Sequence, residues 1–373
     1  MAPAIMLAAG GTGGHLFPAF ALAEELRRRG ITVDLATDER ANRYGADFPA
    51  RAVYRLPAAS ISLRSPGKAV RSTWTLTRGV VKALRLLART RPAAVIGFGG
   101  YPTFAPLVAA RLRGIPRAVH EANAVLGRVN RLLQRQVSAV ATSFEHTRYL
   151  DDRLGPRVAL TGNPVREAVL GLAERAFVPP DGQDPISLLV FGGSQGARFL
   201  SDTVPAALAM LPDDLRRRLA VTQQCRHEDL ARVEAAYDLA GIRATLAEFF
   251  ADLPERISQS HLVIARSGAS TISELTVLGR PAILVPLPHA LDNDQLYNAT
   301  RLAEAGAAWS IEQSDLDANR LVNEIERLFR APERLAAAAN AARGLGKPEA
   351  ASLLADLAER LGTKRLRTEQ AEH

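Results

Sequence analysis

The chain is poor in the residues that cross-link small secreted domains and in those that stack on nucleic-acid bases. Its 373 residues contain a single cysteine, Cys225, which excludes an internal disulfide and fits a reducing compartment. Aromatic residues make up only 5% of the chain. Since proteins that bind single-stranded nucleic acid rely on aromatic platforms, the composition argues against a nucleic-acid partner.

The sequence also lacks a long apolar run of the kind that spans a bilayer. Residues 92–110 carry no charge, but they include GFGGYPTFAP, whose three glycines and two prolines would break a spanning helix. The apolar run Ala4–Ala9 is too short for a signal peptide and has no basic leader. We therefore expect a soluble or peripheral protein.

Acidic residues are scarce in the first part of the chain. Residues 1–162 contain 24 Lys and Arg against 10 Asp and Glu, a net charge of +14, whereas residues 163–373 contain 23 against 29, a net charge of −6. Such a split indicates an anionic partner on one side only, for which nucleic acid, an anionic membrane surface and a phosphorylated substrate are candidates.

Short apolar runs alternate with amphipathic helical patterns, which predicts parallel sheets covered on both faces. The run IMLAAGGTGGH near the start is echoed by LLVFGGSQGA at 188–197, so we expect two Rossmann-like units. The expected strands are 5–8, 32–36, 94–97, 118–120, 139–142, 187–191, 219–222, 262–265 and 282–285.

The proline-bearing stretch 162–184 marks the domain boundary. The sequence predicts a first domain over 1–162 and a second over 163–349. A last helix over about 350–362 is expected to pack back on the first domain, and a charged tail over 363–373 is expected to be disordered.

The first glycine loop follows an apolar strand. Gly10, Gly11, Gly13 and Gly14 would let backbone approach a ligand, and the helix that begins near Leu16 would direct free amides at an anion. The spacing matches neither GxGxxG nor a Walker loop. The alternative is a tight strand-to-helix turn without a ligand.

Two further loops repeat this pattern. GGSQG at 192–196 adds the hydroxyl of Ser194, and RSGAST at 266–271 opens a helix that contains Glu274. The amides and hydroxyls of such a turn favour a diphosphate. Glu274 could accept both hydroxyls of a ribose, or it could only complement the helix dipole.

Acid–base chemistry has two candidate sites. His15, at a helix N-terminus, could accept a proton from a sugar hydroxyl or could only bond a backbone group. Glu121, in HEAN at 120–123, lies at the end of a strand, where open α/β sheets bind ligands. Arg166 at the domain boundary could neutralise a departing diphosphate, or it could be an ordinary surface arginine.

Metal binding is not expected. Asp292-Asn293-Asp294 spells DxD, but it precedes a helix instead of ending a strand of a single-domain fold. No Cys/His cluster has metal-ligand spacing, and no Ser-His-Asp or Cys-His arrangement can be proposed.

The segment 66–91 contains no acidic residue. Apolar residues recur at helical spacing, and basic residues collect around them, which is typical of a membrane-surface helix. The alternative is a core helix with a solvated basic face. The apolar set is Val70, Trp74, Thr77, Val81, Leu84 and Leu87, and the basic set is Lys68, Arg71, Arg78, Lys82, Arg85 and Arg89.

In this order, the motifs resemble the MurG family, the bacterial transferases that add N-acetylglucosamine to undecaprenyl-linked muramyl-pentapeptide in peptidoglycan synthesis. The resemblance spans nearly the whole chain. Its motifs are GGTGGH (10–15), GFGGYPT (97–103), HEAN (120–123), GNPVR (162–166), GGSQGAR (192–198), RSGASTISE (266–274) and DNDQLYNA (292–299).

The resemblance implies an α/β protein of the GT-B fold, two Rossmann-like domains with parallel sheets facing a central cleft. It implies an inverting transfer from UDP-N-acetylglucosamine to the C4 hydroxyl of the muramyl sugar, with no metal or other cofactor. HEAN stands where HEQN is more familiar, and DNDQ replaces a paired-glutamine pattern, so only Gln295 is carried over there.

The resemblance also implies roles for individual residues. The resemblance does not settle the catalytic base, for which His15 is our first choice and Glu121 our second. The basic helical pattern, and not the resemblance, assigns Trp74, Arg78, Lys82 and Arg85 to the membrane side. The residues that would contact UDP-N-acetylglucosamine or the acceptor are Thr12, Gly13, Gly14, Asn123, Arg166, Ser194, Phe250, Ala269, Ser270, Thr271, Glu274 and Gln295, with Phe250 packed against uracil and Glu274 on the ribose.

Such an enzyme would be peripheral on the cytoplasmic side of the inner membrane, with an anionic membrane surface, the lipid acceptor and proteins of cell-wall synthesis and division as partners. It would contribute to cell shape and division. A related transferase that glycosylates diacylglycerol is the alternative, because only the acceptor distinguishes it. A dehydrogenase would need GxGxxG, and a non-catalytic scaffold would leave the loop 266–274 unexplained.

Overall fold

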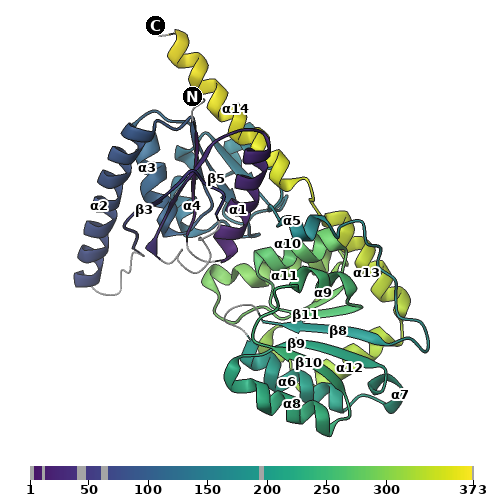
Figure 1. Cartoon of the computed structure of the whole chain (residues 1–373). Helices are drawn as coiled ribbons and strands as arrows, with labels where there is room; N and C mark the ends of the chain where they lie inside the picture. Colours follow the sequence, from purple (N-terminus) through teal and green to yellow (C-terminus); the bar gives the residue numbers. More distant parts are fainter. Residues whose placement is uncertain (1–3, 11–12, 40–47, 60–65, 193–196, 372–373) are drawn as a thin grey trace. The chain divides into compact units, whose positions relative to one another are not determined.

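The computed structural model describes residues 4–10, 13–39, 48–59, 66–192 and 197–371, without the side chains of 66–70, 197, 364 and 366–371. The chain forms two compact units (Figure 1). Unit 1 comprises Met1–Arg166 and Lys347–His373, and unit 2 comprises Glu167–Gly346. The chain thus passes from unit 1 to unit 2 after Arg166, four residues past the boundary predicted after residue 162.

Unit 1 is built on a parallel sheet in the order β3-β2-β1-β4-β5-β6-β7. The central strands are buried, and β1 pairs with β2 and β4 in matched register, Ile5 opposite Val33 and Ala94. The strands are β1 (Ile5–Ala8), β2 (Val33–Thr37), β3 (Ala52–Arg55), β4 (Ala94–Gly97), β5 (Arg117–Glu121), β6 (Ala139–Thr142) and β7 (Val158–Leu160).

Helices cover both faces of this sheet. On one face, α1 (Gly13–Arg28) and α14 (Ala350–Ala371) pack on Leu7 and Ile96. On the other, α2 (Pro66–Thr90), α3 (Phe104–Leu112) and α4 (Arg128–Leu133) enclose a second apolar cluster. Gly30, with φ of 73°, follows α1 in the left-handed conformation that the sequence predicts.

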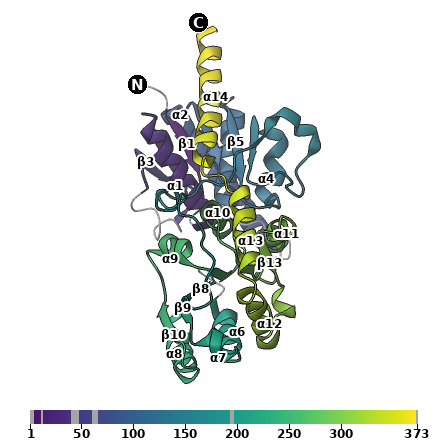
Figure 2. The ribbon, with the colours of Figure 1, turned by 90° about the vertical axis from the view of Figure 1, so that its right-hand side faces the viewer.

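The last helix returns to unit 1 as expected and lies beside α1 (Figures 1 and 2). The Arg29 guanidinium donates to Asp356 at 2.6 Å and to Glu359 at 2.7 Å, which ties the two segments together. Where the sequence predicts a disordered tail from residue 363, the structure continues α14 to Ala371, and Arg365 donates to the carbonyl oxygen of Pro92.

Unit 2 repeats the architecture with the strand order β10-β9-β8-β11-β12-β13, all parallel. Its strands are β8 (Ile186–Phe191), β9 (Leu219–Gln224), β10 (Arg243–Ala247), β11 (Leu262–Ala265), β12 (Ala282–Leu284) and β13 (Ala308–Ser310).

The sheet of unit 2 is likewise covered by helices. One face packs on α6 (Ala197–Ala209), α8 (Leu230–Leu239) and α12 (Ala318–Phe329). The remaining helices are α5 (Glu167–Leu170), α7 (Asp213–Arg216), α9 (Leu253–Gln259), α10 (Ala269–Leu278), α11 (Asp294–Glu304) and α13 (Pro332–Leu345). The two Rossmann-like sheets that the sequence predicts are both present.

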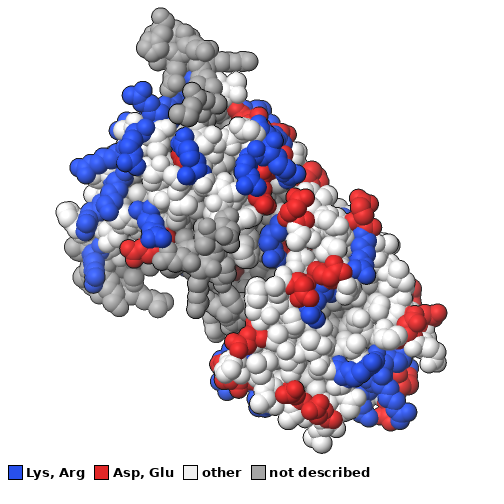
Figure 3. All heavy atoms as spheres, in the orientation of Figure 1, with Lys and Arg blue, Asp and Glu red and all other residues white. Residues whose placement is uncertain are grey.

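The helix α2 corrects one expectation about packing. Trp74 and Val81, which the periodicity assigns to one apolar stripe, are 64% and 42% exposed, whereas Leu76, Ala83 and Leu86 are buried. Only part of the predicted stripe, Trp74, Thr77 and Val81, therefore faces solvent, whereas Leu87 of the same stripe belongs to the core and Leu84 packs against it. Figure 3 shows a column of Lys and Arg side chains over this helix.

In the described part of the chain, no helix combines the length and the apolar character that crossing a bilayer requires.

Candidate active site

The glycine loops of unit 1 follow neighbouring strands. Because β1, β4 and β5 are adjacent and parallel, their carboxyl ends emerge at one edge of the sheet. The structure brings the GGTGGH and GFGGYPT segments together there. A Cβ atom at Gly99 would lie 3.3 Å from Cε1 of His15, and one at Gly100 would lie 3.4 Å from its Nε2. Both glycines have positive φ, 85° and 73°, so backbone packs directly on the imidazole.

His15 lies in the first turn of α1, because the helix begins at Gly13 and not near Leu16. Gly13 and Gly14 form the start of this helix. Thr12, predicted beside them, lies outside the described residues, as does Ser194 of the second loop.

His120 is buried, with 1% of its surface exposed. Its Nε2 lies 3.0 Å from the carbonyl oxygen of Gly162, to which it donates in the neutral tautomer. Burial lowers the pKa of His120 to about 4, opposed by the bond to Gly162. This imidazole is therefore neutral at physiological pH and holds the GNPVR segment instead of facing a substrate.

Glu121, the last residue of β5, is also buried and accepts hydrogen bonds from Asn123, Gly127 and Asn130. Burial raises the pKa of this carboxyl, and the hydrogen bonds oppose the shift. Asn123 is half-buried at the start of the following turn. Arg166 is half-buried too, and its guanidinium carbon lies 5.3 Å from the ring centre of Phe17 on α1.

In unit 2 the third loop joins β11 to α10 at the same kind of edge. Arg266 is 5% exposed and donates to the carbonyl oxygens of Val285 and Pro286, both at 3.1 Å, and to Gln313 at 2.6 Å. Burial lowers the pKa of Arg266 to about 10, so the guanidinium stays charged at neutral pH. It fixes the chain after β12 relative to the end of β11.

Gln295 belongs to the same cluster of loops. Its Oε1 accepts the backbone N–H of Leu287 at 3.0 Å, and its carbonyl oxygen accepts the hydroxyl of Ser267 at 2.8 Å. The structure therefore joins the RSGAST and DNDQ motifs, which are 20 or more residues apart in the sequence. Burial raises the pKa of the neighbouring Asp294.

The start of α10 is shaped for an anion. Gly268 caps the helix without a side-chain bond to the first amides, which belong to Ala269, Ser270 and Thr271. The hydroxyl of Ser270 is buried and has no hydrogen-bond partner in the described part of the chain. Glu274, one turn further along, is 6% exposed. Amides, a hydroxyl and the helix dipole thus converge where a diphosphate could bind.

Of the two adjacent aromatic residues before α9, Phe250 is 8% exposed and Phe249 is 73% exposed. The guanidinium carbon of Arg256 lies 4.3 Å from the ring centre of Phe250. The ring that the sequence assigns to uracil is therefore largely covered by protein, and its neighbour Phe249 is the exposed ring.

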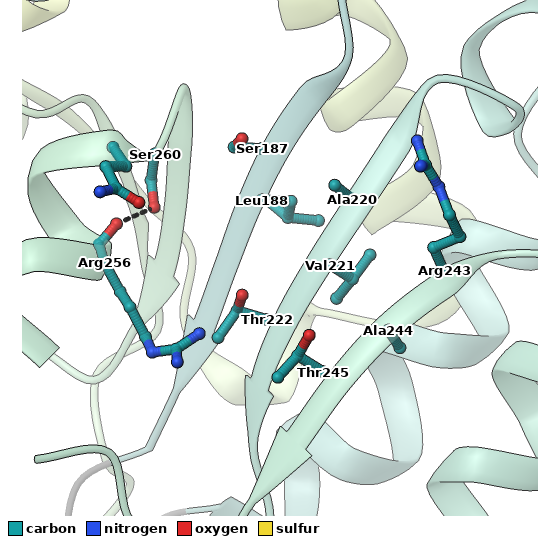
Figure 4. A pocket seen from close by; sticks show the side chains of 11 residues that line it. Ser187, Leu188, Ala220, Val221, Thr222, Arg243, Ala244, Thr245, Arg256 and Ser260 are labelled. Carbon is teal, nitrogen blue, oxygen red and sulfur yellow. Dashed lines mark hydrogen bonds between the residues drawn. The ribbon is translucent and has the colours of Figure 1, made fainter. Parts of the chain in front are cut away.

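A cavity of about 240 Å³ lies elsewhere in unit 2 (Figure 4). It is lined by residues from the amino-terminal part to the middle of β8, β9 and β10, such as Ser187 and Thr222, and by Arg256 and Ser260 of the α9 segment. It is thus removed from the carboxyl ends that carry the loops. Among the residues with described positions, no group of three His, Cys, Asp or Glu side chains could hold a metal ion.

Comparison with known proteins places both units in one family. Residues 5–142 match the glycosyltransferase family 28 N-terminal domain, and residues 187–357 match its C-terminal domain. The chain belongs to glycosyltransferase family 28.

Within family 28, the chain is similar to proteins named UDP-N-acetylglucosamine--N-acetylmuramyl-(pentapeptide) pyrophosphoryl-undecaprenol N-acetylglucosamine transferase. The one from Methylobacterium sp. (strain 4-46) is 54% identical, over 95% of this chain and 96% of the relative. The one from Mesorhizobium japonicum is 50% identical, over 97% of this chain and 96% of the relative.

The fold matches as well. The crystal structure of Acinetobacter baumannii MurG is 30% identical, with a TM-score of 0.79, over 95% of this chain and 99% of that one. The MurG resemblance inferred from the ordered motifs is thereby confirmed, as is the two-domain Rossmann-like architecture.

In this family 28 chain, sequence reasoning missed the structural use of two motif residues. It singled out the HEAN and RSGAST motifs, but it did not assign His120 to the Gly162 carbonyl or Arg266 to the chain after β12. A polar residue at the end of a buried strand was the available signal, although it does not distinguish a ligand contact from a backbone contact.

The neutral His120 predicts a pH dependence of stability. The pKa of His120 is near 6.5 in the unfolded chain and about 4 in the folded protein. Its contribution to the free energy of unfolding is therefore fully present above pH 6.5 and falls by on the order of 3 kcal/mol as the pH drops toward 4 and below. His120→Gln keeps a donor for Gly162 but does not titrate. Its free energy of unfolding, measured by urea denaturation, should therefore fall less steeply over this window.

The matched control is His146→Gln, at an exposed position of the same unit, which should follow the wild-type curve. Other groups titrate equally in all three proteins and cancel in the comparison. Parallel curves for the wild type and His120→Gln would show that His120 does not differ in pKa between the folded and unfolded states.

Proposed function

We propose that this chain transfers N-acetylglucosamine from UDP-N-acetylglucosamine to the C4 hydroxyl of undecaprenyl-pyrophosphoryl-N-acetylmuramyl-pentapeptide, forming a β1→4 bond in peptidoglycan synthesis. Relatives at least 50% identical over nearly the full length carry the name of this transferase, which supports the proposal. The structural observation that carries it is the start of α10.

At that turn, the amides of residues 269–271 and the buried Ser270 hydroxyl would bind the diphosphate of UDP. Glu274, buried one turn into the helix, would accept the hydroxyls of the ribose. Ser194 of the second loop would add a further diphosphate contact. Phe250 would pack against uracil, and its exposed neighbour Phe249 is a second candidate for that contact.

The remaining donor contacts would come from three separate loops. Gln295 would bind sugar hydroxyls, since its main chain and side chain are already fixed by Ser267 and Leu287. Asn123 would contact the donor sugar. Arg166 would bind the diphosphate and neutralise the charge that grows on the departing UDP. With these groups, the reaction would need no metal or other cofactor.

Thr12, Gly13 and Gly14 would border the diphosphates of donor and acceptor at the start of α1. His15, in the first turn of that helix, would take the proton of the acceptor hydroxyl. The hydroxyl oxygen then bonds to C1 of N-acetylglucosamine as the bond from C1 to the UDP oxygen breaks. The bond electrons leave with UDP, and the configuration at C1 inverts.

A diacylglycerol glycosyltransferase is the alternative, because the donor site would be the same. The deciding experiment supplies labelled UDP-N-acetylglucosamine together with the muramyl-pentapeptide lipid or with diacylglycerol. We expect label in the muramyl lipid only, whereas label only in diacylglycerol would refute the proposed acceptor. Glu274→Ala, which removes the ribose contact, serves as the control for contaminating activity and should transfer far less label.

We also propose that the protein binds the cytoplasmic face of the inner membrane through α2, near the proteins of cell-wall synthesis and division. The exposed side of this helix supports the proposal, because it presents Trp74 and Val81 beside a row of basic residues. The basic residues on this side are Arg71, Arg78, Lys82, Arg85 and Arg89. An exposed apolar strip beside a basic strip is typical of interfacial helices.

Charge reversal of Arg78, Lys82 and Arg85 to Glu should weaken binding to vesicles containing phosphatidylglycerol on the order of 100-fold or more, since each basic residue contributes about 1 kcal/mol near an anionic surface. Vesicle sedimentation measures the effect.

The control reverses three exposed arginines of unit 2, namely Arg243, Arg320 and Arg334, and should bind as the wild type does. Equal binding of the α2 variant and the wild type would exclude α2 as the membrane contact.

A further inference from the structure

Glu121 is a buried carboxylate whose two oxygens are both in use. Its exposed fraction is 4%, and it ends the buried strand β5. Oε1 accepts the backbone N–H of Asn123 at 3.1 Å and its side-chain Nδ2 at 3.2 Å. Oε2 accepts the backbone N–H of Gly127 at 2.7 Å and Nδ2 of Asn130 at 2.9 Å. Four neutral N–H donors thus face the lone pairs of one carboxylate.

All four donors belong to the stretch that runs from the end of β5 into the first turn of α4. Asn123 stands near its beginning, Gly127 caps α4, and Asn130 lies within that helix. Asn130 also donates to the carbonyl oxygen of His120 at 3.2 Å. The carboxylate therefore ties the beginning of the turn to its end, and the buried Asn130 ties it back to the strand.

The same network lies beneath the histidine of the first loop. A Cβ atom at Gly99 would lie 3.5 Å from Nδ2 of Asn130 and 3.3 Å from the His15 ring. Asn130 thus links Glu121 to this glycine turn, since its Nδ2 approaches Gly99 and also donates to Glu121. A general base needs a lone pair directed at the substrate proton, and the four bonds occupy both oxygens of Glu121.

For Asn123 the consequence is a fixed orientation. Its main chain and its side-chain amide are both bound to one oxygen of Glu121, so the carboxylate sets the side-chain rotamer and determines which end of the amide donates. An amide held in this way is preorganised for a sugar, because the ordering cost is already met when the ligand arrives.

We propose that Glu121 is a positioning residue, which acts through Asn123 by holding its amide for the donor sugar and which takes no proton in the transfer. This inference rests on the proposed function, in which Asn123 contacts N-acetylglucosamine. It removes Glu121 from the candidates for the base and leaves His15.

The test uses Glu121→Gln, which keeps the shape of the side chain. The side-chain amide of this variant can place its nitrogen at the position of Oε1 or of Oε2. In either case the nitrogen faces two N–H donors, so either the two hydrogen bonds from Asn123 or those from Gly127 and Asn130 are lost. We expect kcat/KM for UDP-N-acetylglucosamine to fall roughly 10- to 100-fold, the effect of losing hydrogen bonds to a charged group. In an Asn123→Ala background, the same change should cost less than about twofold, because the two residues act as one unit.

The pH profile separates positioning from proton transfer. If His15 is the base, the acid limb of kcat/KM keeps its midpoint in Glu121→Gln. A lost acid limb, rescue of the variant by added formate, or full multiplicative effects of Glu121→Gln and Asn123→Ala would each overturn the proposal. Glu145→Gln, at an exposed position of unit 1, is the matched control and should be silent.

A binding measurement distinguishes failure of this inference from failure of the proposed function. Measured by calorimetry, Glu121→Gln should weaken the binding of UDP-N-acetylglucosamine but leave the affinity for UDP unchanged, whether or not the wild type transfers sugar to the muramyl lipid. An equal loss for both ligands would indicate general disruption and reject the positioning role. If Glu121→Gln does not fold, Asn130→Ala replaces it. Asn130→Ala should weaken the binding of UDP-N-acetylglucosamine measurably but by less than about tenfold, and the effect should again be absent in the Asn123→Ala background.

Discussion

Both units depend on the parallel pairing of adjacent strands. Because neighbouring strands run in the same direction, every strand of a sheet ends at the same edge, and the loops that follow them are gathered there irrespective of their distance in the sequence. In unit 1 this places the chain after Ala8, Gly97 and Glu121 together. In unit 2 it does the same for the chain after Phe191, Ala265 and Leu284. The central strands, such as β1, β4 and β11, are buried along their whole length, so the polar groups that could bind a ligand lie beyond their ends.

Buried polar side chains then determine the shapes of those loops. Glu121 accepts four N–H groups from the turn after β5 and from α4. His120 donates to the carbonyl oxygen of Gly162, and Arg266 donates to two carbonyl oxygens after β12. All three are less than 6% exposed, and each is compensated by backbone or amide partners, as burial of a polar group requires. Three residues proposed to contact substrate, Asn123, Arg166 and Ser270, lie in the segments that these hydrogen bonds hold.

The central strands could be predicted from the sequence because they are continuous apolar runs. The four strands that it missed, β3, β7, β10 and β13, are the edges of the two sheets. Edge strands are partly exposed, as the sequences AVYR and RATLA illustrate, and so they lack the apolar signal. For α2, the helical periodicity was recognised but the buried face only in part, since Trp74 and Leu76 are both apolar and only packing distinguishes them. Likewise, the motifs located Glu121, but its four donors emerge only from the folded turn.

We propose that the loops at the carboxyl ends of unit 2 form the UDP site. Amide hydrogen exchange of the whole protein, measured with and without UDP, tests this assignment. UDP should slow exchange in residues 247–252, 266–271 and 285–295, and should slow it less in Glu274→Ala at the same UDP concentration. Slowing confined to the amino-terminal parts of the strands, at 187–188, 220–222 and 243–245 around the cavity of Figure 4, would contradict it.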